Sequence, residues 1–198
     1  MYYISKYLHI ENGFIFENGN KTFSHQEDFP IFIKEAYKNF VQAYPKFYKM
    51  DDLCKLAFLG SEMLLKNELE KDIALLFSNN EGSLDTDIKH QHTIQTAENY
   101  YPSPALFVYT LPNIAIGEVS IRHQLKSESA FFIAHAFQAD YMHSYTQYLL
   151  QNNKAEKVVC AWIHFLNGSY KAIFYLVEKK GELKHNIEQV KKIIKWKL

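Results

Sequence analysis

Short apolar runs alternate with longer segments of helical spacing along most of this 198-residue chain, and this alternation constrains its fold more than any other feature. The clearest run is IALLF at Ile73–Phe77, which predicts a buried strand over residues 71–79. Ahead of it, over residues 50–66, apolar side chains recur every three or four positions, as they do on one face of a helix. Strands that alternate with helices favour an α/β fold with a mostly parallel sheet and helices on both faces.

The same patterns predict ten main elements. The expected strands are 2–10, 71–79, 130–134, 157–165 and 170–178, and the expected helices are 30–44, 50–66, 112–125, 137–151 and 185–197. Residues 14–16 follow a turn and offer a short hairpin partner, whereas residues 20–30 and 79–96 are polar and are expected to be loops. We therefore expect a mixed, mostly parallel five-stranded sheet, in which the hairpin at Asn167-Gly168 adds one antiparallel strand. No linker or repeat divides residues 1–198, so they are predicted to form a single domain.

Composition and charge argue against several classes of protein. The chain has 22 basic and 22 acidic residues, and Arg122 is its only arginine, so a nucleic-acid binder is disfavoured. No apolar run approaches the roughly 20 residues of a membrane helix, and the first ten residues lack the layout of a signal peptide. Two cysteines, Cys54 and Cys160, make neither a disulfide framework nor a metal site. We expect a cytoplasmic protein without a metal or another cofactor.

Residues 103–140 contain the most informative motif. Its members, in order, are Pro112, Asn113, Gly117, Ser120, Ile121 and Arg122, followed by Leu125 and Lys126. In order and spacing this motif resembles that of the β-ketoacyl-ACP synthases, which are condensing enzymes of the thiolase fold. The segment 44–51 is similar to the family's lead into its first helix. The resemblance covers about residues 44–177 and implies a single thiolase-like half-fold, the N-terminal half of such an enzyme.

The departures from the family pattern bear on activity. The resemblance places the family's catalytic cysteine at Ala136, in the segment Ala134-His135-Ala136-Phe137. It also implies that two catalytic histidines would come from a second half-fold that this sequence does not contain. Condensation proceeds through an acyl-enzyme on a thiolate, which alanine cannot supply. We therefore expect a catalytically inactive, ketosynthase-like accessory protein in fatty-acid or polyketide-type biosynthesis, which pairs with an active condensing enzyme or binds acyl carrier protein.

Two further interpretations remain open at this point. In the first, the chain is an acyl-thioester hydrolase or transferase that uses His135 as a general base with Asp140 on the same scaffold. In the second, it is a binding module in which His135 only lines a vestigial pocket. Arg122 likewise has two readings, either a contact to the carrier's phosphate or an ion pair with Glu118 four residues earlier.

Assembly is predicted from two apolar segments. The short strand 130–134 would seek a partner if it lay at a sheet edge. The helix 137–151 carries large apolar side chains whose exposure would mark an interface, namely Phe137, Tyr141, Met142, Tyr145, Tyr148, Leu149 and Leu150. We expect a homodimer, or a heterodimer with a condensing enzyme, formed through one or both segments.

Overall fold

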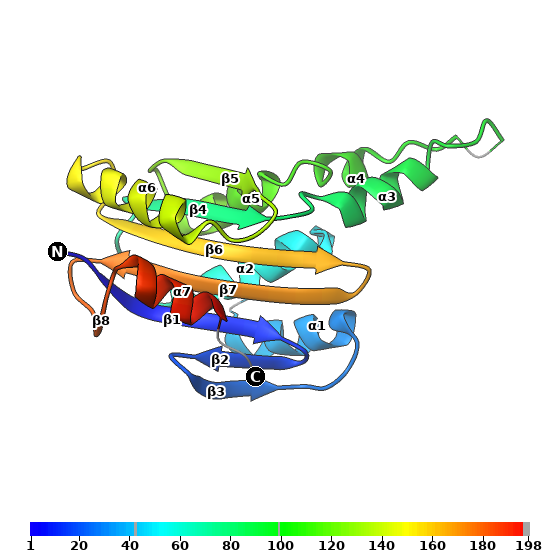
Figure 1. Ribbon diagram of the computed structural model, residues 1–198. Coiled ribbons are helices and arrows are strands. Elements are labelled where there is room, and N and C mark those ends of the chain that lie inside the picture. The colour runs from blue at the N-terminus through cyan, green and yellow to red at the C-terminus, as the bar shows by residue number, and fades with distance from the viewer. Residues whose placement is uncertain (42, 99, 196–198) are drawn as a thin grey trace.

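The computed structural model describes residues 1–41, 43–98 and 100–195. Its eight strands join in a mixed sheet in the order β3-β2-β1-β7-β6-β4-β5, with β8 paired to β1 (Figure 1). The α/β fold class predicted from the sequence is confirmed.

The elements have the following bounds. The strands are β1 (Tyr3–Glu11), β2 (Phe14–Glu17), β3 (Asn20–Ser24), β4 (Ile73–Asn79), β5 (Ser129–Ile133), β6 (Lys157–Leu166), β7 (Ser169–Glu178) and β8 (Leu183–Lys184). The helices are α1 (Phe29–Phe40), the 3-10 helix η1 (Pro45–Lys49), α2 (Asp52–Leu64), α3 (Leu84–His92), α4 (Pro104–Val108), α5 (Ile114–His123), α6 (Ala139–Gln151) and α7 (Ile187–Lys195). The predicted helices also included residues 42, 196 and 197, which lie outside the described residues.

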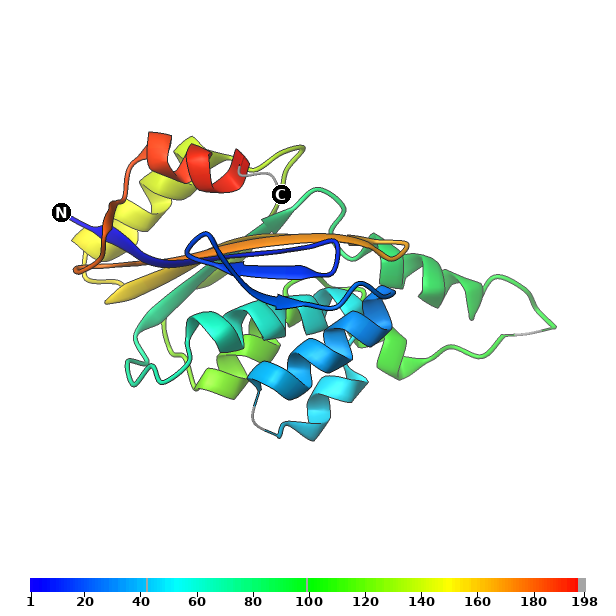
Figure 2. The same ribbon diagram turned by 90° about the horizontal axis from the view of Figure 1, so that it is seen from below.

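β4 is the most enclosed strand. All seven of its residues are buried, and it pairs in parallel with β5 on one side and β6 on the other. Helices α1, α2 and α5 cover one face of the sheet, and α6 and α7 cover part of the other (Figure 2). A continuous apolar run suits this position, because both faces of β4 meet side chains from helices.

The expected five-stranded, mostly parallel sheet is corrected in its details. The sheet has eight strands, and its described pairings are five antiparallel against two parallel. Residues 20–24 form β3 instead of a loop, and their polar side chains are largely exposed at a sheet edge, so no apolar alternation marks them. The turns Asn12-Gly13, Asn18-Gly19 and Asn167-Gly168 all have positive φ at both residues, as tight hairpins require, and they make the neighbouring strands antiparallel.

Helix α3 lies in a segment expected to be a loop, and α4 lies in a segment for which the sequence predicted no element. Only Asp85 and Thr86 are buried in α3, and no residue is buried in α4. Neither helix has the apolar stripe by which a surface helix is recognised in a sequence.

One close approach between a helix and the sheet gives a test of this packing. Gly60 of α2 faces Phe174 of β7 so closely that an added Cβ would overlap the aromatic ring, whereas a Cβ on Gly117 of α5 would meet no atom. We expect Gly60→Ala to lower the free energy of unfolding by about 1–3 kcal/mol. The matched Gly117→Ala should raise it by about 0.5–1 kcal/mol, because alanine is the better helix former. Urea denaturation of both variants measures the difference, and equal effects would contradict the packing of α2 on β7.

Candidate functional site

The carboxyl ends of β4 and β5 form the point at which chain connections diverge. After β4 the chain passes to the face of the sheet that carries α5, and after β5 it passes to the opposite face, which carries α6 (Figure 2). In open α/β sheets such a switch point is the usual place for a binding site. His135 and Ala136 lie there, in the connection between β5 and α6, and both are exposed.

The structure does not bring the two residues of the hydrolase interpretation together. Asp140 lies in the first turn of α6, where its Oδ2 is 3.1 Å from Nζ of Lys191 on α7. Within the described ranges, no hydrogen bond or ion pair joins Asp140 to His135. The hypothesis that Asp140 orients His135 as a general base therefore stays a prediction, and no contact between the two side chains supports it.

A hollow of about 290 Å³ separates the start of α6 from α7. Its lining residues are Phe137, Gln138, Ala139, Asp140, Lys191, Ile194 and Lys195. Phe137 follows Ala136 directly, and its ring also meets Trp162 of β6 edge-on, with the two centroids 6.3 Å apart. This hollow begins one residue beyond the predicted nucleophile position and is lined by apolar side chains together with charged ones.

The motif at residues 112–122 builds α5. Pro112 and Asn113 immediately precede the helix, Gly117 and Ser120 lie within it, and Ile121 is exposed. Arg122 is in the last turn, where it reaches Glu62 of α2, with Nε 2.7 Å from Oε1 and Nη2 3.0 Å from Oε2. The expected pair with Glu118 is wrong, because Glu118 is buried on another side of α5 and binds Lys46 at 2.8 Å.

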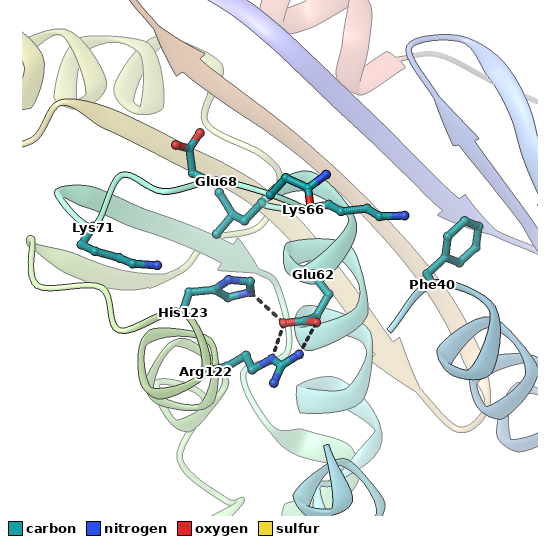
Figure 3. Close-up of a pocket in the computed structure, with 9 residues that line it drawn as sticks. Phe40, Glu62, Lys66, Glu68, Lys71, Arg122 and His123 are labelled. Carbon is teal, nitrogen blue, oxygen red and sulfur yellow. Dashed lines mark hydrogen bonds and ion pairs between the residues drawn. The ribbon is translucent and has the colours of Figure 1, made fainter. Parts of the chain in front are cut away.

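Glu62, Arg122 and His123 form a charged cluster, which we call the α2–α5 clamp. It lines a hollow of about 250 Å³ at the amino end of β4, opposite the end that carries His135. The carboxylate of Glu62 lies between the guanidinium of Arg122 and the imidazole of His123, whose Nε2 is 3.0 Å from Oε1 (Figure 3). Lys71 extends toward His123 and Lys66 toward Phe40 in the same view.

Two nitrogens of the Arg122 guanidinium, Nε and Nη2, are already bonded within the clamp. Besides its two bonds to Glu62, the guanidinium lies over the ring of Tyr44, 5.0 Å from the centroid. Burial by itself raises the pKa of Glu62, but His123 and Arg122 outweigh it and hold that pKa below its usual value. The arrangement joins two helices, and the sequence did not reveal it because its partners lie 60 positions apart.

The outer edge of β5 is open. β5 pairs with β4, and of the described strands it pairs with no other. Bonds to β4 use the carbonyl of Glu128 and the N–H of Ala134, so the alternation along a strand turns the backbone groups of Ser129, Phe131 and Ile133 outward. The opposite sheet edge, β3, carries Lys21 and polar neighbours, which protect an edge against pairing, whereas β5 has no charged residue.

A row of aromatic side chains on α6 continues this edge. Tyr141, Tyr145 and Tyr148 follow one another with ring centroids 6.0 and 6.3 Å apart, and Phe132 of β5 meets the first two. Tyr141 and Tyr148 are half exposed. The free edge of β5 and this tyrosine row form one surface, which we call the β5–α6 surface.

Comparison with solved structures identifies the fold. The ishigamide ketosynthase/chain length factor aligns with 90% of this chain and is covered over 62% of its own length, with a TM-score of 0.66 and 14% identity. A ketosynthase in complex with its chain length factor from Xenorhabdus doucetiae aligns with 90% of the chain, over 79% of the matched chain, with a TM-score of 0.58 and 16% identity. A type II polyketide synthase ketosynthase in complex with its acyl carrier protein gives a TM-score of 0.62 at 14% identity, again over 90% of this chain and 62% of the matched one.

These similarities show that the chain has the thiolase-like fold of the ketosynthases and chain length factors. At this level of identity they are evidence for the fold and for nothing further. The chain spans less than two thirds of the first of these matched chains. No protein-family model matches the sequence, and the comparison with curated proteins finds no match.

Residues 1–41, 43–98 and 100–195 contain no helix that is both long and apolar enough to cross a membrane. The same residues contain no group of three or more histidine, cysteine, aspartate or glutamate side chains placed to hold a metal ion.

The clamp predicts a specific loss of stability. In Arg122→Met the buried carboxylate of Glu62 loses its bidentate partner, so the free energy of unfolding should fall by about 1.5–3 kcal/mol. Lys38→Met removes one member of an exposed pair with Glu35 and should change stability little. Chemical denaturation of the two variants makes the comparison, and a negligible effect of Arg122→Met would mean that Arg122 is free for an external ligand.

Glu62 also predicts how stability depends on pH. Because its pKa is lower in the folded chain than in the unfolded chain, the unfolded state binds more protons as the pH falls below the usual glutamate pKa of about 4.3. The stabilisation from Glu62 is thus present above that pH and is lost as the pH falls through the folded pKa. In Glu62→Gln this part of the acid dependence should disappear, as measured by urea unfolding between pH 6 and pH 3, while an unchanged slope would rule out the clamp as its source.

Proposed function

We propose that this chain is a ketosynthase-like accessory protein of fatty-acid or polyketide-type biosynthesis, without condensing activity of its own, that pairs with an active condensing enzyme. The observation that carries the proposal is the β5–α6 surface, an uncharged free strand edge continued by half-exposed tyrosines. Edges of this kind are templates for pairing with another chain. The matched structures include a ketosynthase in complex with its chain length factor, which makes a condensing enzyme the natural partner class.

The thiol groups of the chain support the absence of condensing chemistry. Ala136 stands where the resemblance places the nucleophile, and Cys54 and Cys160 are both buried. Burial raises the pKa of the Cys160 thiol to about 11 and that of Cys54 well above its usual value. Since the thiolate is the reactive form, neither thiol is suited to hold an acyl group.

Partner binding can be tested with a condensing enzyme encoded beside this chain in its source genome. The two proteins are co-expressed, purified through a tag on one of them, and examined by light scattering. We expect a 1:1 complex, and addition of acyl carrier protein to the complex tests the second predicted partner. A chain that remains separate from the enzyme at micromolar concentrations would refute the proposal.

A substitution at Ile133 isolates the contribution of the strand edge. Its backbone N–H faces outward, so Ile133→Pro removes a donor that β4 does not use. Ile133→Ala is the matched control, because it truncates the same exposed side chain but keeps the N–H. We expect Ile133→Pro to weaken partner binding by roughly tenfold or more relative to Ile133→Ala, as the loss of a buried hydrogen bond predicts.

Calorimetric titration measures both affinities, and thermal unfolding shows whether the free variants are equally stable. Equal affinities in two equally stable variants would mean that the partner does not pair with the backbone of β5.

A further inference from the structure

The segment between β4 and α5 projects from the body of the molecule. Helices α3 and α4 and the described residues beside them reach past the end of the sheet in both views (Figures 1 and 2). We call the described residues 84–98 and 100–111 the arm. The sequence predicted mainly loops here, and the proposed function so far assigns the arm no role.

The arm exposes a concentration of large apolar side chains. They are Leu84, Ile88, Tyr100, Tyr101, Phe107, Val108 and Leu111. Phe107 is 57% exposed although its ring meets His90 of α3 at 5.6 Å, so the two helices cover each other only in part. Because the arm extends away from the sheet, the body of the same chain does not cover these groups. Such a concentration of exposed large apolar side chains in one projecting segment is typical of an interaction site.

The arm adjoins the β5–α6 surface. Ile133, the last residue of β5, is exposed, and its Cδ1 would lie 3.2 Å from a Cβ placed on Gly82. Gly82 lies two residues before the arm and Pro112 immediately follows it, and Pro112 borders the same position at 4.0 Å. Both ends of the arm therefore lie near the end of β5, and a partner paired with β5 would lie beside the arm.

The size of the interface also requires more than the β5–α6 surface. A five-residue strand is only about 17 Å long. Two half-exposed tyrosines add roughly 200 Å². A stable complex buries about 800 Å² on each partner. The exposed apolar groups of the arm offer additional apolar surface that a partner could bury.

We propose that the arm clasps the condensing enzyme that pairs with β5, so that Phe107, Val108 and Leu111 pack against an apolar surface of that enzyme. This inference rests on the proposed function and assigns its partner a second contact. α3 contributes Ile88 to the same contact.

Two double variants test the arm. In Ile88→Ser with Phe107→Ser, two arm side chains that are 40% and 57% exposed become polar. The matched control is Ile31→Ser with Tyr48→Ser, at 46% and 55% exposure, on α1 and η1, outside the arm. Titration against the co-expressed condensing enzyme should give at least a tenfold weaker affinity for the arm variant and less than a twofold change for the control.

The outcomes separate the two proposals. If the wild-type chain binds the enzyme and the arm variant binds equally well, the arm inference is wrong and the proposed function stands. If the wild-type chain binds no condensing enzyme, the proposed function itself fails. Equal weakening by both double variants would overturn the arm inference, since the effect would not be local. Sedimentation of the chain alone completes the test. If the wild-type chain is a dimer, and only the arm variant is a monomer while its affinity for the enzyme is unchanged, then a second copy of the chain binds the arm instead.

Discussion

The parallel pairing of β4 with both β5 and β6 is the constraint on which the rest of the structure depends. With all of its residues buried, β4 needs helices on both faces and strands on both sides. β6 continues through the β7 hairpin into the antiparallel half of the sheet. β5 has no such continuation, so the outer edge of this short strand remains available for a second protein. The central strand thus determines which edge of the molecule is open.

The α2–α5 clamp changes the meaning of the motif in α5. Arg122 belongs to the residues that resemble the condensing enzymes, but its guanidinium is bound to Glu62 and lies over Tyr44. Its two hydrogen bonds join α5 to α2, and β5 is the next element along the chain. The bonds of Arg122 therefore hold in place the helix that precedes the edge strand.

Much of the fold could be predicted from the sequence, because local patterns mark it. The run IALLF identified β4, and Asn167-Gly168 identified the β6–β7 hairpin. β3 and α3 were missed, since an exposed polar strand and a helix without an apolar stripe have no such mark. The candidate sites were harder to predict from the sequence, because they depend on contacts that only the folded chain makes. Glu62 and Arg122 come together only in the folded chain, and His135 and Asp140, only five residues apart, do not interact.

The central claim is that a condensing enzyme attaches at the β5 edge. Amide hydrogen exchange, measured by mass spectrometry on the chain alone and in its complex, tests this most directly. Outward-facing amides of β5 are unpaired in the free chain and would become hydrogen-bonded in the complex. The account predicts slower exchange over residues 129–133 on binding, with no change over β3 at the opposite edge. Protection of β3, or a complex that leaves β5 exchanging at its free rate, would contradict it.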